Sequence, residues 1–292
     1  MVWRKITIVG VGLLGGSLAL AIKKRNLARQ VHGYVRRAAS IEECTNLGVA
    51  DQVTCNLTEA VTGADLIVLC TPIAQMAELA RTMLPALEKE AIVTDVGSVK
   101  NVLAEDVEPL FLNSSAVFIG SHPMAGAETM GVHSARADLF ENAVCAITPT
   151  ARCDPKALKQ LETFWESLGA RPLIISPRIH DELVARSSHL PHVLAAELAN
   201  YVLSPVHPKE QALLCASGFR DTTRIASGSP EMWRDIALAN RANLSRVLGV
   251  LIEDLQEFRH ALESGEAKTV EEFFAIAKHR RDQWTGPNAS PE

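Results

Sequence analysis

A histidine in a segment rich in turn-forming residues is the group in this sequence best suited to acid–base chemistry. His122 lies in residues 120–128 (GSHPMAGAE), between the glycine-flanked end of a predicted strand and a Pro-Met turn. The pKa of an unperturbed histidine is close to neutral pH, so a neutral imidazole can accept a proton from a substrate. A single histidine at a strand end is more often a structural residue, so the interpretation depends on the other motifs of the chain.

A glycine-rich segment near the N-terminus predicts a dinucleotide-binding site. Residues 10–15 (GVGLLG) follow a predicted strand and precede a helix that is expected to begin near Leu14. In such a turn Gly10 allows the tight bend, Gly12 lets the backbone approach a pyrophosphate, and Gly15 lets the helix pack on the strand. The helix N-terminus supplies the anion site. The strand–turn–helix context favours this interpretation over a purely structural glycine turn.

The end of the second predicted strand favours NADP over NAD. NAD sites usually carry an acidic residue there, which accepts hydrogen bonds from the ribose hydroxyls. This chain has Val35 at that position, followed by Arg36 and Arg37. A guanidinium can bind a 2′-phosphate bidentately, and no carboxylate repels it. The alternative is that both arginines belong to a solvated strand end. The remaining residues predicted to contact the cofactor are Leu13, Leu14, Thr71, Pro72 and Gly97.

Two further segments carry side chains that could bind a ligand. Arg220 and Arg224 lie in residues 218–226 (GFRDTTRIA), and a guanidinium can fix a carboxylate bidentately. Their spacing alone fits a solvated helix face, but the glycine before them favours a loop that closes on a ligand. His189 and His192 have the i, i+3 spacing of two metal ligands. No nearby motif completes a metal site, so we expect no metal.

The elements that would position these residues form an alternating pattern up to residue 176. Short β-branched runs alternate with amphipathic helices, which is typical of a parallel sheet with crossover helices. Several runs are apolar on both faces, as in a sheet that is covered on both sides. Strands are expected over residues 6–9, 31–35, 66–70, 92–95, 117–120, 143–148 and 172–175, with helices that include residues 76–87 and 156–168.

From residue 177 onward only helical patterns are convincing. One covers residues 180–203, with a kink expected at Pro191. A second begins at residues 229–231 (SPE), where Ser is a suitable N-cap and Pro fits the first turn, and it continues to about residue 262. A capping box at residues 269–272 (TVEE) is expected to open the last helix.

These patterns predict an α/β fold with two domains. We expect a Rossmann-type, doubly wound, mostly parallel sheet in residues 1–176, an all-α dimerisation domain in residues 177–284, and a disordered tail in residues 285–292. Helices longer than about 25 residues expose more apolar surface than one small helical domain buries. We therefore expect a homodimer that forms through the helical domain.

The composition points to a soluble, cytoplasmic protein. Apolar residues make up 47% and charged residues 22%, and the net charge of -5 gives no reason to expect nucleic acid or an acidic membrane as a partner. Six scattered cysteines without a C-x-x-C pair are expected to be free thiols in a reducing compartment. No segment is convincing as a signal peptide or a membrane span.

Several segments, taken in order, resemble the prephenate/arogenate dehydrogenase family of tyrosine biosynthesis. Besides the glycine-rich turn and the His122 segment, they are residues 95–100 (DVGSVK), 188–192 (SHLPH), and 218–226 with 232–235 (MWRD). The resemblance covers nearly the whole chain. It implies oxidative decarboxylation of a cyclohexadienol: the alcohol carbon C4 gives a hydride to the nicotinamide, the ring carboxylate leaves as CO2, and the ring becomes aromatic.

The resemblance also implies roles for single residues. His122 matches the family's catalytic base, and Ser98 matches a serine that orients the base or binds the hydroxyl, unless it only caps the backbone. Arg224 matches the substrate-binding arginine. His192 matches a position near the substrate side chain, where a histidine suits the pyruvyl group of prephenate better than the amino-acid group of arogenate. Two other matches, which could instead be packing or surface residues, are Trp233 and Glu128.

We therefore expect an NADP-dependent prephenate dehydrogenase that forms 4-hydroxyphenylpyruvate. The alternatives are an arogenate dehydrogenase, a non-catalytic NADP-binding sensor, and a β-hydroxyacid-type dehydrogenase, whose helical-half lysine these segments do not fit. Residues 216–218 (ASG) depart from the consecutive glycines of many members, which bears on loop closure and substrate choice. We expect no regulatory or chorismate mutase domain after Trp284, so that tyrosine, if it inhibits, acts at the active site.

Overall fold

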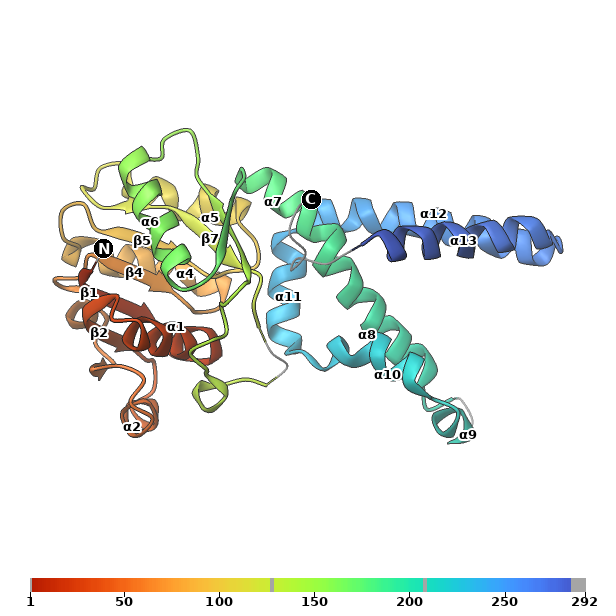
Figure 1. Ribbon diagram of the computed structural model, residues 1–292, viewed down its shortest axis with the longest axis horizontal. Coiled ribbons are helices and arrows are strands. Elements are labelled where there is room, and N and C mark those ends of the chain that lie inside the picture. Colours follow the sequence, from red (N-terminus) through yellow and green to blue (C-terminus); the bar gives the residue numbers. More distant parts are fainter. Residues whose placement is uncertain (1, 127–128, 207–208, 285–292) are drawn as a thin grey trace.

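The computed structural model describes residues 2–126, 129–206 and 209–284. Strands and covering helices make up the first part of the chain, and the part that follows is helical throughout its described residues (Figure 1). The last strand ends at Ile174 and the first helix of the second part begins at Pro177. The α/β fold with a following all-α part is confirmed. The predicted tail, residues 285–292, lies outside the described residues.

The main sheet has six parallel strands in the order β3-β2-β1-β4-β5-β6. The strand order reverses between β1 and β4, and dinucleotides bind at such a switch point in open α/β sheets. The sequence did not predict β3, because a three-residue strand has no apolar run of its own. The strands are β1 (Trp3–Val9), β2 (Ala28–Tyr34), β3 (Gln52–Thr54), β4 (Leu66–Leu69), β5 (Ile92–Asp95) and β6 (Val117–Phe118).

A second sheet of three strands contains the candidate base. Strand β7 (Gly120–Pro123) runs antiparallel to β8 (Val144–Thr148), and β8 runs parallel to β9 (Arg171–Ile174). The single strand expected over residues 117–120 is therefore wrong, since β6 ends at Phe118 and a new strand starts at Gly120. His122 lies inside β7 rather than between a strand end and a turn.

Helices cover both faces of the main sheet, and each face has its own apolar cluster. One cluster packs Leu18 and Ile22 of α1 with Trp165 of α6, and the other packs Met76 and Ala80 of α4 under β4 and β5. This arrangement explains why the strands are apolar on both faces. The helices of this part are α1 (Leu13–Lys24), α2 (Ala39–Asn46), α3 (Leu57–Val61), α4 (Ile73–Met83), α5 (Asn101–Asp106) and α6 (Pro155–Ser167), with short 3₁₀ turns η1 (Leu84–Ala86), η2 (Glu108–Phe111) and η3 (Val132–Ser134).

The second part extends away from the sheets, with α12 and α13 side by side as a hairpin (Figure 1). Its elements are α7 (Pro177–Val184), the π-helical turn η4 (Ala185–His189), α8 (Leu190–Val202), α9 (Lys209–Leu213), α10 (Ser217–Thr223), the 3₁₀ turn η5 (Arg224–Ser227), α11 (Pro230–Ala239), α12 (Arg241–Glu263) and α13 (Ala267–Gln283). In the described part of the chain, no helix combines the length and the apolar character that a membrane span requires.

The long helix expected over residues 180–203 contains the π-helical turn η4, which ends directly before Leu190 and Pro191. The N–H of Leu190 donates to the carbonyl of Ala185, the i to i−5 pattern of a π-turn. Pro191 lies in the first turn of α8, immediately after this π-turn.

Two further helix predictions need correction. Ser229 caps α11 as expected, but the helix breaks at Asn240 instead of continuing to residue 262, because that buried amide bonds to other elements. Helix α13 begins at Ala267, before the expected capping box, and Thr269 Oγ1 donates to Glu266 instead of capping the helix. The segment expected to be a ligand-closing loop forms helix α10 and the turn η5.

Candidate active site

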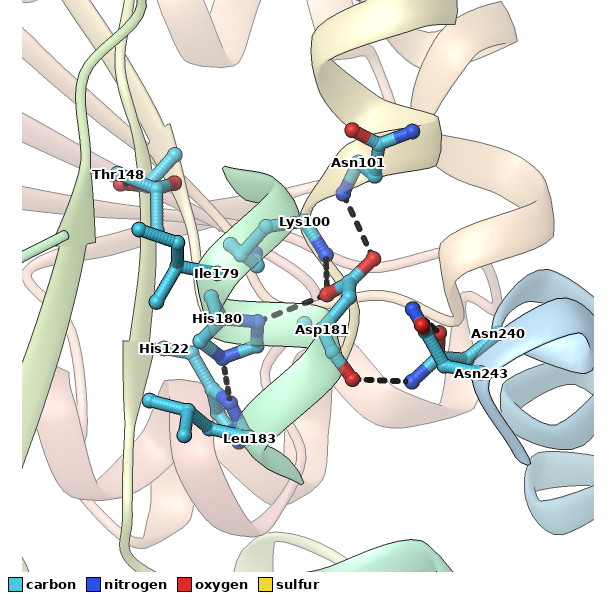
Figure 2. Close-up of polar contacts among 12 residues, drawn as sticks. Lys100, Asn101, His122, Thr148, Ile179, His180, Asp181, Leu183, Asn240 and Asn243 are labelled. Atoms are coloured by element: carbon cyan, nitrogen blue, oxygen red, sulfur yellow. Dashed lines mark hydrogen bonds and ion pairs between the residues drawn. The ribbon is translucent and has the colours of Figure 1, made fainter. Parts of the chain in front are cut away.

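Three side chains form a hydrogen-bonded row across the junction of the two parts (Figure 2). The imidazole Nδ1 of His122, on β7, lies 2.9 Å from Nε2 of His180, on α7. The other ring nitrogen of His180, Nδ1, lies 2.8 Å from Oδ1 of Asp181. His180 is 1% exposed and Asp181 is 2% exposed, whereas His122 is only half-buried as a residue. The row therefore ends on the one histidine that retains access to a ligand.

The surroundings of His122 keep its imidazole neutral. Burial lowers the pKa of His122 well below its usual value, and the neighbouring His180, Lys100 and His189 lower it further. A neutral imidazole has one nitrogen lone pair free to accept a proton. At neutral pH the geometry and charge of this site therefore suit a general base.

Asp181 joins the helical part to the sheet part. Its carboxylate accepts hydrogen bonds from the N–H groups of Lys100, at 2.8 Å, and Asn101, at 2.9 Å, at the start of α5. Its backbone carbonyl accepts from Nδ2 of Asn240, at 2.8 Å, where α11 meets α12. Asp181 thus links α7 to α5 and to the junction between α11 and α12 (Figure 2).

A buried ion pair fixes the ends of β5 and β7 relative to each other. The ammonium group of Lys100 pairs with the Asp95 carboxylate, and both side chains are fully buried. Lys100 also donates to the carbonyl of Ser121, at 2.9 Å, next to His122 in β7. Ser121 Oγ in turn donates to the carbonyl of Asp95, at 2.7 Å. This network holds the backbone on which His122 is carried.

Ser98 is half-buried in the connection between β5 and α5. The ring of His122 is hydrogen-bonded to His180, and no bond between Ser98 and His122 is found among the described residues. The backbone of Ser98 instead lies near His189, where it favours the protonated form of that ring. The second role expected for Ser98, a hydrogen bond to a substrate hydroxyl, stays a prediction.

His192 and Trp233 form a stacked pair in the helical part. Their ring centroids are 3.7 Å apart and the rings are inclined by 29°. The Nδ1 atom of His192 donates to the carbonyl of Ser188 at 2.9 Å, because only the protonated nitrogen can bond to a carbonyl oxygen. Burial lowers the pKa of His192. Its Nε2 atom is therefore a neutral hydrogen-bond acceptor.

His189 has a different environment from His192. It is buried, its Nδ1 lies 3.2 Å from Nδ2 of Asn240, and burial is the main cause that lowers its pKa to about 4. The two histidines thus have separate hydrogen-bond partners, although their spacing is that of metal ligands. In the described ranges, no group of three or more His, Cys, Asp or Glu side chains is arranged to hold a metal ion.

Arg224 begins η5 and is exposed. The turn η5 packs against α8, the helix that carries His192. Arg220 is exposed one helical turn earlier, with its Nε 3.9 Å from the Asp221 carboxylate. Glu128, the remaining predicted pocket residue, lies outside the described residues. Of the other expected residues, Ser98 and His122 come from the sheet part, while His192, Arg224 and Trp233 come from the helical part.

The glycine-rich turn has the geometry of a dinucleotide site. Gly10 has a φ of +100°, and an added Cβ would lie 2.8 Å from the carbonyl oxygen of Cys70. A Cβ at Gly15 would overlap the carbonyl of Gly10, so only glycine lets α1 pack this close. A Cβ at Gly12 would meet no protein atom within 4 Å. The open space at Gly12, beside the side-chain-uncapped N-terminus of α1, fits the pyrophosphate of a bound dinucleotide.

The other predicted cofactor residues lie at the same edge of the sheet. Thr71 follows β4 beside Gly10, and its buried hydroxyl has no hydrogen-bond partner among the described residues. Val35 is buried at the end of β2, followed by the exposed Arg36 and Arg37. Leu13 and Leu14 are half-buried in the first turn of α1, Pro72 caps α4, and the Gly97 N–H donates to Asp95. These side chains and backbone groups are compatible with a dinucleotide.

The sequence did not predict the side chains that are hydrogen-bonded in a row with His122. Residues 95–100 indicated roles for Ser98 and Gly97 but none for Lys100, and nothing was assigned to His180, Asp181 or Asn240. The available signal was His180-Asp181, two adjacent titratable residues in the first turns of an amphipathic helix. Their burial could not be read from the sequence, because it depends on β7 and α5, which lie far away in the chain.

Comparison with known families matches both parts of the chain. Residues 18–174 match the family model for the nucleotide-binding domain of prephenate dehydrogenase. Residues 176–278 match the model for the prephenate dehydrogenase dimerization domain. Among curated proteins, the prephenate dehydrogenase of Bacillus subtilis is 35% identical over 95% of this chain and 75% of its own length.

Solved structures show the same arrangement of both parts. A prephenate dehydrogenase from Aquifex aeolicus in complex with hydroxyphenyl propionate and NAD+ is 30% identical, with a TM-score of 0.90 and coverage of 97% of this chain and 99% of the other. An arogenate dehydrogenase from Synechocystis is 32% identical, with a TM-score of 0.81 and coverage of 96% and 99%.

Proposed function

Because the chain belongs to the prephenate dehydrogenase family, we propose that it converts prephenate to 4-hydroxyphenylpyruvate and CO2, with NADP+ as the hydride acceptor. In this proposal residues 1–176 bind the dinucleotide, and residues 177–284 bind the substrate and form a homodimer. The observation that carries it is the half-buried, neutral His122 at the junction of the two parts.

His122 acts as the general base in this mechanism. Its neutral imidazole accepts the proton of the ring hydroxyl, and Ser98 hydrogen-bonds that hydroxyl from the connection after β5. When bound, the nicotinamide supplies the hydride acceptor. The electrons released when the ring carboxylate leaves as CO2 complete the aromatic ring. Burial of His122 keeps the base unprotonated before the reaction, so proton transfer can accompany the loss of hydride.

Substrate anions would be bound from the helical part. Arg224 offers a guanidinium that can fix a carboxylate in both position and orientation. Because η5 packs on α8, Arg224 and His192 belong to neighbouring elements of one substrate-binding face. Trp233 holds the ring of His192 by stacking, so that the ring presents a fixed Nε2 atom.

The choice of NADP rests on the end of β2. A buried Val35 followed by two exposed arginines leaves no carboxylate for the ribose hydroxyls and offers two cations for a 2′-phosphate. NAD is the alternative cofactor, because the Aquifex aeolicus relative was solved with NAD+. The variant Arg36→Ala should raise the KM for NADP and leave the KM for NAD nearly unchanged.

One observation favours arogenate as the second candidate substrate. The Nδ1–H of His192 is already donated to Ser188, so its neutral Nε2 can accept a hydrogen bond from an ammonium group. The pyruvyl carboxylate of prephenate would instead require His192 to take up a proton. The similarity to the Synechocystis arogenate dehydrogenase gives this alternative the same family support.

Initial rates with NADP and NAD, each with prephenate and with arogenate, test the proposal. Rapid NADPH formation with prephenate supports both the substrate and the cofactor. Turnover of arogenate alone would replace the substrate, and equal kcat/KM with NAD would remove the cofactor preference. No turnover in any of the four assays would leave a dinucleotide-binding sensor as the better interpretation.

A further inference from the structure

We propose that His180 is a positioning residue: held by Asp181, it keeps the proton of His122 on Nδ1, so that Nε2 carries the lone pair that accepts the substrate proton. The inference deepens the proposed function, on which it rests for the identity of the proton donor. The direction of the hydrogen bonds themselves follows from this chain alone.

The carboxylate of Asp181 sets that direction. An ionised carboxylate only accepts hydrogen bonds, and Oδ1 of Asp181 already accepts from the backbone N–H of Lys100. The ring nitrogen that lies 2.8 Å from the same oxygen, Nδ1 of His180, must therefore carry the proton and donate it. With its proton on Nδ1, the imidazole of His180 has its lone pair on Nε2.

The direction continues to His122 through one more hydrogen bond. Nε2 of His180 accepts, so Nδ1 of His122, 2.9 Å away, donates. The opposite tautomer of His122 would place two lone pairs against each other in a site where His180 is buried from water. A buried acceptor without a donor is unfavourable, so this tautomer is disfavoured. The remaining lone pair of His122 is on Nε2, the nitrogen that does not face His180.

The tautomer matters because His122 carries a single proton. Burial lowers the pKa of His122, so the imidazole has one protonated nitrogen, and the position of that proton decides which nitrogen can act as a base. His180 and Asp181 belong to α7, whereas His122 belongs to β7. The proton of His122 is therefore held on Nδ1 only while α7 packs against β7 and the start of α5. Figure 2 draws the hydrogen bonds that join these elements.

Two variants at one position separate this role from simple packing. His180→Leu removes the acceptor for Nδ1–H of His122 but keeps a side chain of similar size. His180→Gln replaces the ring with an amide whose carbonyl oxygen can accept the same N–H. Thermal unfolding and NADPH titration of both variants serve as controls for folding and cofactor binding.

The direct readout is the ¹⁵N spectrum of histidine-labelled protein without substrate. The signals of His122 are assigned by their loss in His122→Asn, among the nine histidines of the chain. We expect a protonated Nδ1 and an unprotonated Nε2 in the wild type and in His180→Gln. In His180→Leu the proton should move to Nε2 or be shared between both nitrogens. A wild type with the proton on Nε2 would overturn the proposal.

Kinetics with the best substrate provide the second readout. We expect His180→Leu to lower kcat by roughly 10²-fold, the scale of a general base in the wrong state, with KM changed less than threefold or so. His180→Gln should recover most of kcat. The inference is wrong if His180→Leu keeps both wild-type kcat and the wild-type tautomer, or if His180→Gln loses as much activity as His180→Leu.

The two readouts separate this inference from the proposed function. If no substrate is turned over, the proposed function fails, but the tautomer of His122 still decides the role of His180. If His180→Leu does not fold, the spectra of the wild type and His180→Gln still test whether His180 sets the tautomer of His122. A Gln variant that loses the Nδ1–H tautomer would then count against positioning by hydrogen-bond acceptance.

Discussion

At the scale of single residues, the proposed chemistry depends first on His122. Replacing it with Asn should lower kcat by roughly 10²–10⁴-fold, because an amide cannot accept the hydroxyl proton as a base. Cofactor affinity should remain near that of the wild type, since the glycine-rich turn lies on β1 and α1 and His122 lies on β7. Steady-state rates and a fluorescence titration with NADPH measure the two quantities. Unchanged turnover would remove His122 from the mechanism.

Arg224 is the residue proposed to bind a substrate carboxylate. Arg224→Ala should raise the KM for the substrate more than it lowers kcat, because the guanidinium binds an anion that does not itself exchange the proton or hydride. Arg220→Ala is a matched control, since Arg220 is an exposed arginine of the preceding turn with an acidic neighbour. Equal effects of both substitutions, or a loss of NADP binding in Arg224→Ala, would contradict the assignment.

The protonation of His192 should make the KM for prephenate depend on pH. Burial lowers the pKa of its imidazole in the free enzyme, and a bound carboxylate would favour the protonated form. The KM for prephenate should therefore rise with pH between the lowered pKa of His192 in the free enzyme and its higher pKa in the complex, because binding then requires uptake of a proton. Arogenate, whose ammonium group needs the neutral ring, should lack this rise. KM values between about pH 5 and 8 test this, and His192→Gln should flatten the prephenate profile.

Single residues also show which parts of the candidate site could not be predicted from the sequence. The local segment around His122 was sufficient to mark it as a candidate base, because the signal lies in consecutive residues. The groups that orient it could not be identified in this way, since His180 and Asp181 come close to His122 only through the packing of α7 on β7. The same holds for Lys100, whose pairing with Asp95 depends on burial.

At the scale of elements, local signals predicted where strands and helices exist but not where long helices break. The apolar runs predicted six of the seven expected strands, and Ser229 was correctly identified as a helix cap. The π-turn η4 ends just before Pro191, where a kink was expected, whereas the break at Asn240 has no strong local signal. They are favoured by tertiary contacts, since η4 places buried His189 next to Asn240, and Asn240 bonds to Asp181.

The turn between β1 and α1 allows a matched pair of substitutions. Gly12→Ala should leave the Tm nearly unchanged, because the added Cβ meets no protein atom within 4 Å, but it should weaken NADP binding by blocking the pyrophosphate. Gly15→Ala should lower the Tm strongly, because its Cβ overlaps the carbonyl of Gly10. Calorimetry and NADPH titration distinguish the two. A Gly12→Ala variant with wild-type affinity would show that the phosphates lie elsewhere.

At the scale of the whole molecule, the site exists only where the two parts meet. The sheet part supplies the candidate base and the proposed cofactor site, and the helical part supplies the proposed substrate cations and the row proposed to orient that base. Asp181 bonds to both sides, and α11 packs against α4. The sequence predicted this division but not the contacts across it, because no local pattern encodes which helix meets which sheet edge.

The helical part exposes apolar side chains that one chain does not bury. In α12 and α13, Leu255, Phe274 and Ile276 are each about half exposed, and no residue of α13 is buried. Exposed apolar surface of this extent on a projecting hairpin indicates a partner, and a second copy of the chain fits the family model for a dimerization domain. Burial of this surface would stabilise the dimer through the hydrophobic effect.

We therefore predict a particle of twice the chain mass of 31.6 kDa in light scattering and sedimentation at micromolar concentration. Ile276→Glu, which places a charge on the apolar surface of α13, should shift the particle toward a single chain. Lys268→Glu, a charge change at an exposed position on the charged face of the same helix, which Lys268 shares with Glu272, should leave the mass unchanged. A wild type that is strictly monomeric would contradict the dimer. A dimer that persists in Ile276→Glu would place the interface away from α13, where the exposed apolar residues of α8 would be the next surface to test.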